Sequence, residues 1–268
     1  MKLFWLTGFL LLTLTLPATA TDFTHSHALW SELLQKHVSW INDGTASVVD
    51  YDGFKNDNKN LQTYLSRLAS VTRDQFDSWG RDQQLAFLIN AYNAFTIKLI
   101  LDNYPGIASI RDTGSLFTSP WKKEFFHLLG DRRHLDWIEH EMIRGSDRYN
   151  EPLIHFAVNC ASIGCPALLN QAFIADRLEA QLLDVTRRFL QDRSRNGFND
   201  ERNVLSVSSI FDWYEEDFRK GWRGYSSLKT FFAKHADLLS TDETIRLKIG
   251  AGAYEIEYLK YDWRLNKK

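Results

Sequence analysis

The segment that most constrains this chain is residues 83–104, which read QQLAFLINAYNAFTIKLILDNY. On a helix this sequence places apolar side chains on almost every side, so the helix must be buried rather than half exposed. Asp82 is expected to cap its start, and Pro105 to end it. The rest of the chain is therefore predicted to pack around one central buried helix.

Asn90, Tyr92 and Asn93 place polar groups in the middle of this apolar segment. Asn90 and Asn93 are one turn apart and share a helix face. A buried amide is unfavourable unless its donors and acceptors find partners. Two interpretations are open. In the structural one, the amides bind the backbone of residues 107–133; in the functional one, they orient a catalytic histidine or donate hydrogen bonds to a substrate carbonyl.

Residues 1–20 are predicted to be a cleavable signal peptide. Lys2 precedes an apolar stretch at residues 3–16, Pro17 follows, and Ala18 to Ala20 form a small-residue cleavage site. The apolar stretch is shorter than the roughly 20 residues of a membrane span. We therefore expect export to the periplasm or secretion, with no stable membrane insertion after cleavage.

Residues 21–268 are expected to form a single globular domain. The formal net charge is −2, and cleavage would remove Lys2 and change it to −3. This charge gives no electrostatic footprint for nucleic acid or for an anionic membrane surface. With only 5 prolines and no low-complexity tract, the chain does not resemble a disordered one.

Hydrophobic periodicity predicts further helices and a few short strands, which gives an α+β class: a helix-rich domain with a small, mostly antiparallel sheet. Asp212 and Asp217 are expected to keep one side of the helix at residues 209–218 in water. The other elements are helices at residues 28–41, 60–69, 134–144, 176–190 and 228–235, and strands at residues 48–51, 153–160, 204–207 and 253–261.

Cys160 and Cys165, the only two cysteines, lie in the segment HFAVNCASIGCP. In an oxidising compartment they can form a disulfide, although such a small loop gains little stability from chain entropy. The alternative is a reactive thiol at Cys160, which needs a histidine or another group that lowers its pKa. Spacing alone does not decide between them. A zinc site has too few ligands here, so neither a metal nor a cofactor is expected.

Two histidines are candidate partners for a thiol. His155 precedes Cys160 by five residues, which places the two side chains on opposite faces of an extended strand. A direct pair then requires a bend, and a lone histidine in an apolar strand is also typical of a hydrogen-bonded core residue. His140 lies in the short predicted helix with Glu139 and Glu141 beside it, where it is either a base or part of an exposed polar face.

Several motifs occur together in one order: NAYN, IEH, HFAVNCASIGCP and YDWRLN. In this combination the chain resembles the domain of unknown function 547 family across about residues 60–265. The resemblance implies an ordered, helix-rich domain that carries both cysteines, a histidine at His155, and the NAYN and IEH residues. It implies no substrate.

Two hypotheses follow. The first is an exported cysteine-dependent hydrolase or acyl transferase with Cys160 as nucleophile, His140 or His155 as base, and Asn90 or Asn93 as orienting or oxyanion group. The second is a non-catalytic envelope domain that binds a small molecule, a peptide or an envelope ligand, with a structural Cys160–Cys165 disulfide. Under either hypothesis the cysteine turn, the Asn90–Asn93 face and His140 are predicted to meet at the principal cleft.

Overall fold

The computed structural model describes residues 23–115 and 118–268, so the predicted signal peptide lies outside the described residues. About 52% of the described residues are helical, and the strands form small sheets. The helix-rich α+β class is therefore confirmed. One hydrophobic core extends from Trp30 to Leu265.

The predicted central helix is α5 (Arg81–Leu101), and every residue from Gln84 to Ile97 is buried. Its length and composition would suit a membrane span, but 89% of the apolar window lies inside the protein. The prediction that Asp82 caps it is wrong. Gly80 is the cap, and the side chain of Gln83 accepts a hydrogen bond of 3.0 Å from its backbone N–H.

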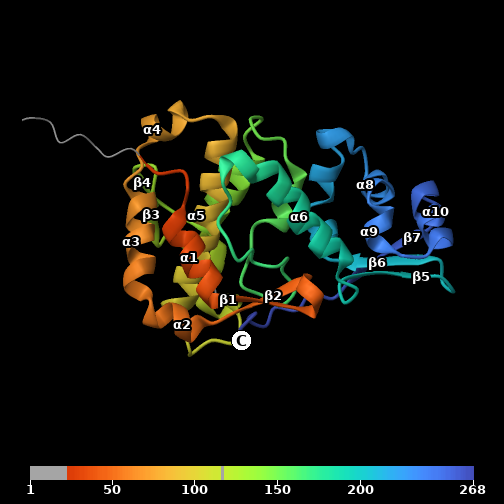
Figure 1. Cartoon of the computed structure of the whole chain (residues 1–268), viewed down its shortest axis with the longest axis horizontal. Helices are drawn as coiled ribbons and strands as arrows, with labels where there is room; N and C mark the ends of the chain where they lie inside the picture. Colours follow the sequence, from red (N-terminus) through yellow and green to blue (C-terminus); the bar gives the residue numbers. More distant parts are fainter. Residues whose placement is uncertain (1–22, 116–117) are drawn as a thin grey trace, which may run out of the picture.

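Most of the other helices lie towards the two ends of the molecule (Figure 1). α1, α3 and α4 lie beside α5 at one end, α8 to α10 gather at the other, and α6 lies between them. The α-helices are α1 (Ala28–His37), α2 (Tyr51–Asn56), α3 (Asn58–Ala69), α4 (Arg73–Ser78), α6 (Leu178–Gln191), α7 (Ile210–Trp213), α8 (Leu228–Lys234), α9 (Ala236–Leu239) and α10 (Glu243–Ala251). Short 3-10 turns lie between the helices and strands: η1 (Asn42–Gly44), η2 (Ile110–Thr113), η3 (Pro120–Lys122), η5 (Pro152–Phe156), η6 (Ala175–Arg177), η7 (Glu215–Phe218) and η8 (Trp222–Gly224).

Three small sheets complete the described fold. Two are antiparallel pairs, and in the third β6 pairs antiparallel with β5 and parallel with β7, so the sheets are mostly antiparallel as expected. The strands are β1 (Val38–Ile41), β2 (Ala46–Val49), β3 (Phe126–Leu128), β4 (Asp131–Arg133), β5 (Asn196–Asn199), β6 (Val204–Ser208) and β7 (Glu255–Leu259).

The prediction of a strand at residues 153–160 is wrong, because this segment forms a 3-10 turn and a loop. Pro152 begins the 3-10 turn η5, and the Glu151 side chain caps it by accepting a 3.0 Å bond from the Leu153 N–H. Proline suits the first position of a helical turn, because it has no N–H to leave unpaired. The segment after the turn is an irregular loop, so the argument that placed His155 and Cys160 on opposite faces does not apply.

Two of the predicted helices are shorter in the structure than the sequence suggested. The opening helix ends at His37, where the chain turns into β1. The helix at residues 209–218 divides into α7 and η7, and Asp217, which was expected in water, is only 1% exposed. The short helix at residues 134–144 is present as the π-helix η4 (Trp137–Arg144). A π-turn is rare and occurs often at functional sites.

Candidate functional site

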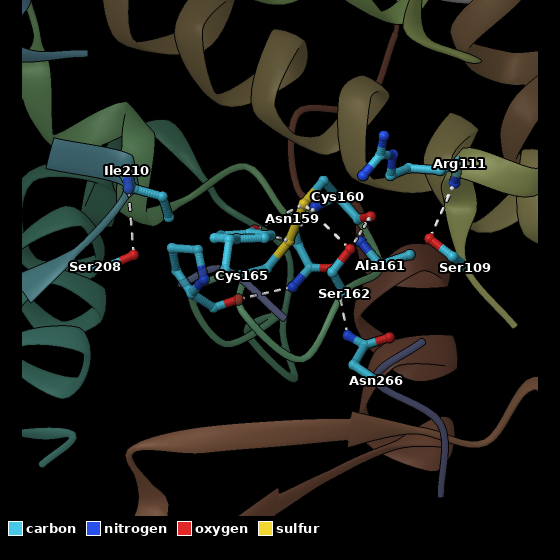
Figure 2. The surroundings of a disulfide bond; sticks show 12 residues. Ser109, Arg111, Asn159, Cys160, Ala161, Ser162, Cys165, Ser208, Ile210 and Asn266 are labelled. Carbon is cyan, nitrogen blue, oxygen red and sulfur yellow. Dashed lines mark hydrogen bonds between the residues drawn. A yellow bond between two sulfur atoms is a disulfide. The ribbon is translucent and has the colours of Figure 1, made fainter. Parts of the chain in front are cut away.

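The loop at residues 157–166 carries a disulfide between Cys160 and Cys165 (Figure 2). The side chain of Asn159 binds this loop at two points. Its amide donates to the Pro166 carbonyl at 2.7 Å, and its side-chain oxygen accepts the Ala161 N–H at 2.8 Å. In this state neither sulfur is a free thiol, so the disulfide interpretation of the two cysteines describes the structure.

The two asparagines of α5 are buried and hydrogen-bonded, as predicted. Asn90 donates to the Phe173 carbonyl at 2.7 Å and accepts the N–H of the same residue at 3.0 Å. Asn93 donates to the Ala157 carbonyl at 3.0 Å and accepts the Asn159 N–H at 2.8 Å. The two asparagines therefore bind the cysteine loop and the chain that follows it. The structural interpretation, which expected them to bind residues 107–133, was wrong about their partners.

The disulfide lies in the wall of a pocket of about 280 Å³. His140, His155 and Glu139 share this pocket with Cys160 and Cys165, whereas Asn90 and Asn93 are not among its lining residues. The convergence of the cysteine turn with His140 is therefore as predicted, and α5 contributes through Asn93 from behind the loop. The lining residues are Tyr92, Ser119, Trp121, Asp136, Glu139, His140, His155, Val158, Cys160, Cys165, Pro166, Ile210, Trp213, Tyr214, Tyr261 and Trp263.

His155 and Asp217 form a buried pair. The Nε2–H of His155 donates to Asp217 Oδ2 at 2.8 Å, and the ring stacks on Tyr214 with 3.8 Å between centroids. Burial lowers the pKa of His155, although the bond to Asp217 opposes this, so the ring is neutral at pH 7. Its Nδ1 is buried and has no hydrogen-bond partner among the described residues.

Asp217 is also held by two cations. Arg144 Nε donates to Oδ2 at 2.6 Å, and Lys220 Nζ donates to Oδ1 at 3.0 Å. Burial alone would raise the pKa of Asp217, but the hydrogen bonds from His155 and Arg144 hold it below its usual range. Asp217 is therefore an anion that fixes the orientation of the His155 ring.

His140 lies on η4 at the pocket edge. Arg144 Nη1 donates to His140 Nδ1 at 2.6 Å. The other ring nitrogen, His140 Nε2, lies 3.7 Å from Asp136 Oδ1. An Nδ1 that accepts a hydrogen bond carries no proton, so the neutral ring has its proton on Nε2. Arg144 thus links the two histidines through the Asp217 carboxylate.

Two carboxyl groups face the pocket from η4 and the residue before it. Glu139 is 4% exposed, and its charge, added to the effect of burial, raises the pKa of both Tyr92 and Tyr214. Burial also raises the pKa of Asp136. Among the described residues that line the pocket there is no lysine or arginine.

Aromatic rings form the rim of the pocket. Trp263 lies 5.6 Å from Trp213, nearly parallel to it, and 5.7 Å from Trp121. Tyr261 contacts both Trp213 and Trp263, at 4.8 and 4.5 Å between centroids. Trp213 is 45% exposed, and the guanidinium of Arg111 lies over Trp263 at 5.4 Å.

Tyr261 also contacts the disulfide directly. Its hydroxyl lies 3.1 Å from Cys160 Sγ and 3.2 Å from Cys165 Sγ. The backbone N–H of Cys160 donates to Cys165 Sγ at 3.0 Å. Burial raises the pKa of Tyr261 above its ordinary value, so the hydroxyl keeps its proton and remains a donor.

The family model described as "Protein of unknown function, DUF547" matches residues 76–190. Over these residues the chain is similar to the DUF547 family. No curated protein and no solved structure matches the chain. The DUF547 segment includes α5, η4 and the cysteine loop, and it is narrower than the range of about residues 60–265 over which the resemblance was expected.

The pocket draws on more than the DUF547 segment. Trp213 ends α7, Tyr214 follows it, and Tyr261 and Trp263 follow β7. Asp217 lies in η7 and does not line the pocket itself, but it binds the lining residue His155. Sequence reasoning singled out none of these five residues for the site. The signal was present in the FDWYEEDF and YDWRLN segments, which combine aromatic rings with acidic groups. Among the described residues no group of three or more histidine, cysteine or acidic side chains is arranged to hold a metal ion.

Proposed function

We propose that this pocket binds a small organic cation, and that the domain acts by binding in the disulfide form described here. The observation that supports the proposal most is its lining. Two carboxyl groups, Asp136 and Glu139, face a space walled by aromatic rings, and no described lining residue is a lysine or arginine. A negative, partly desolvated pocket attracts cations and repels anions.

Aromatic faces strengthen this preference. A cation placed over the face of a tryptophan or tyrosine is attracted by the ring quadrupole, by about 0.5–2 kcal/mol depending on desolvation. Trp121 and Trp213 line the same space as the two carboxyl groups, whereas the Tyr214 ring already stacks with His155 and lies under the Arg144 guanidinium. A compact ammonium group fits both features, and the pocket volume of about 280 Å³ is that of a small-molecule site rather than a peptide groove.

Choline and its uncharged isostere 3,3-dimethyl-1-butanol provide the test, measured by tryptophan fluorescence or calorimetry. The two compounds have the same shape and differ in charge. We expect the positive charge of choline to contribute at least about 1.4 kcal/mol to the binding free energy. This corresponds to about tenfold tighter binding than that of the isostere. Equal affinity for the two compounds, or no binding of choline at millimolar concentration, would overturn the proposal.

A matched pair of variants locates the charge. Glu139→Gln keeps the shape of the buried side chain and removes its charge, so we expect it to weaken choline binding about tenfold and leave the isostere unaffected. Glu141→Gln makes the same change on the same helix at an exposed position and should alter neither affinity. An equal effect of both substitutions would show that the pocket carboxylate is not the determinant.

A cysteine-dependent hydrolase or acyl transferase is the second candidate. It is favoured by one observation: Cys160, His140 and His155 line the same pocket, and His155 has an Asp217 partner on one nitrogen and a free Nδ1 on the other. This chemistry requires the disulfide to be reduced, so that Cys160 becomes the nucleophile and a histidine accepts its proton.

The reduced protein is tested with a p-nitrophenyl ester. We expect the Cys165→Ser variant, in which Cys160 is free, to hydrolyse the ester at least about 100-fold faster than the Cys160→Ser variant. His155→Gln in the Cys165→Ser background should slow this hydrolysis. Equal rates in the two cysteine variants would exclude Cys160 as a nucleophile.

The proposed setting for either activity is outside the cytoplasm, in the periplasm or the medium. This part of the proposal is supported by the signal-peptide pattern of residues 1–20 and by a cysteine pair that is oxidised in the structure. Disulfides persist in oxidising compartments. The proposed ligand is then a small molecule that reaches the envelope or the surroundings of the cell.

A further inference from the structure

We propose that the Cys160–Cys165 disulfide is a thiol-exchange centre, at which a small thiol attacks Cys160 and Cys165 is the leaving sulfur. The two sulfurs differ in access. Cys160 is partly exposed in the pocket wall, whereas Cys165 is 2% exposed. An incoming thiolate therefore meets Cys160 first, and accessibility is one of the factors that decides which sulfur is attacked.

The loop does not depend on the disulfide for its shape. On one side Asn93 and Asn159 bind its backbone, as described above. On the other side, the Ile163 N–H donates to the Arg264 carbonyl at 2.8 Å and the Gly164 N–H to the Asp262 carbonyl at 2.9 Å. These bonds hold the loop from two directions without the sulfurs, so the bond between the sulfurs can break while the loop keeps its place.

The surroundings of Cys165 suit a leaving thiolate. The Cys160 N–H and the Tyr261 hydroxyl both point at Cys165 Sγ, at 3.0 and 3.2 Å. The guanidinium of Arg195, which is ion-paired with Asp192 at 3.2 Å, donates to the Cys165 carbonyl and holds this residue in place. Hydrogen bonds to a sulfur stabilise its thiolate and lower the pKa of the thiol, and a sulfur with a lower pKa leaves faster.

The reaction is a two-step exchange. A thiolate attacks Cys160 Sγ, the Sγ–Sγ bond breaks, and its electron pair remains on Cys165 Sγ. A second thiolate then attacks the external sulfur of the mixed disulfide and releases Cys160 as a thiolate. Two external thiols lose two protons and become one disulfide, and the two cysteines take up two protons and become thiols. The cystine is reduced by two electrons and the external thiols are oxidised.

The substrate class is a small thiol, since a pocket of about 280 Å³ admits a compound or a single side chain. This inference goes beyond the proposed cation binding. It shares the pocket with that proposal but does not require the ligand to be charged, because the attacked bond is uncharged.

The first test measures reduction of the folded protein. The full-length purified protein is incubated with millimolar dithiothreitol, free thiols are counted with a maleimide, and the fold is followed by circular dichroism. We expect two thiols per chain to appear in minutes with the spectrum unchanged. If thiols appear only after denaturant is added, the disulfide is structural and the proposal is overturned.

The second test identifies the attacked sulfur. Cys165→Ser leaves a thiol at Cys160, and Cys160→Ser leaves one at Cys165; each variant is incubated with cystamine, and the mixed disulfide is followed by mass spectrometry. We expect Cys160 to react at least about tenfold faster than the more buried Cys165. Equal or reversed rates would overturn the assigned order. Circular dichroism and the melting curve confirm that each variant is folded before rates are compared.

A third measurement separates this inference from the proposed cation preference. Cysteamine and 2-mercaptoethanol are compared at equal thiolate concentration, each rate being divided by its rate with a small reference disulfide. A larger normalised rate for cysteamine supports both proposals. Equal normalised rates support thiol exchange and count against the cation preference. If neither thiol reduces the folded protein, thiol exchange is overturned, and the cation preference is then judged from choline binding alone.

Discussion

Asn93 shows how one side chain connects the core to the pocket. It is 2% exposed on α5, and its amide bonds to Ala157 and Asn159 fix the backbone immediately before Cys160. The sequence predicted burial and hydrogen bonding at this position because an amide in an apolar helix is unfavourable without partners. It did not identify the partners, since they lie 64 and 66 residues away.

Replacing Asn93 with leucine should leave the Asn159 N–H and the Ala157 carbonyl without partners. We expect the free energy of unfolding to fall by about 1–3 kcal/mol, which is the cost of an unsatisfied buried group. Urea denaturation followed by circular dichroism measures it. Asn60→Leu, an equivalent change at an exposed position on α3, is the control and should alter stability by less than about 0.5 kcal/mol. Similar losses in both variants would contradict the structural role of Asn93.

His27 gives a prediction for pH. Burial, with a smaller contribution from the charge of His25, lowers the pKa of His27 to about 3. In the unfolded chain its pKa is near 6.5. Between these two values the unfolded state binds a proton that the folded state does not. The stability contributed by neutral His27 is therefore complete above about pH 6.5 and is lost as the pH falls towards about 3.

The measurement is the slope of the unfolding free energy against pH, from pH 6 to pH 4. One proton of difference corresponds to about 1.4 kcal/mol per pH unit. We expect the His27→Gln variant to have a slope shallower than that of the wild-type protein by about this amount, whatever its absolute stability. Identical slopes would indicate that His27 titrates normally in the folded protein.

At the scale of elements, periodic segments were predictable and aperiodic ones were not. Leu61, Leu65 and Leu68 mark α3 by their spacing, and the start of the predicted helix was within a few residues of the one observed. Residues 153–160 are an apolar run without a period, which fits a buried strand and a buried turn equally well. The β3–β4 hairpin escaped notice because His127 and Arg132, its middle pair, are polar and exposed.

Gly164 tests the contact between the cysteine loop and the chain after β7. A β-carbon at this position would lie 2.9 Å from the ring of Tyr261. The ring must move, so we expect Gly164→Ala to reduce the unfolding free energy by about 1–3 kcal/mol and to slow thiol exchange by displacing the Tyr261 hydroxyl.

Gly250→Ala is the matched control, because its β-carbon meets nothing within 4 Å on α10. Alanine favours a helix over glycine, so this variant should be neutral or more stable by up to about 1 kcal/mol. Urea denaturation and the rate of reduction by dithiothreitol are measured on both variants. If Gly164→Ala changes neither the unfolding free energy nor the rate of reduction, the Tyr261 ring is not fixed against Gly164 as the structure shows it.

At the scale of the molecule, the sequence indicated that three unusual segments meet, and in the structure the cysteine loop and η4 line one pocket while Asn93 supports that loop. Asp217 was misjudged for a physical reason. Its helical spacing placed it on the polar side of residues 209–218, but the segment divides after Trp213 and the side chain enters the interior, where His155 and Arg144 bind it. The spacing of apolar and polar residues predicts which side of a regular helix is buried, but it does not predict where the helix is interrupted.

Export is the prediction that concerns the whole chain. Protein isolated from its native host is expected to begin at Thr21, because the small residues Ala18 to Ala20 fit the pattern of a signal-peptidase cleavage site. Mass spectrometry of the intact protein and of its N-terminal peptide measures this. An intact Met1 or Lys2 terminus on most molecules would contradict it.

The way residues 261–266 cross the cysteine loop has a kinetic consequence. The Asn266 N–H binds the Ala161 carbonyl, and its side chain accepts a bond from Tyr51, 215 residues away in the sequence. Contacts between such distant residues require large loops to close, and large loops close late and slowly. Helices such as α3 can therefore form early from local contacts, whereas the pocket comes together only when both halves of the chain have met. An intermediate with most of its helices in place would still lack the site.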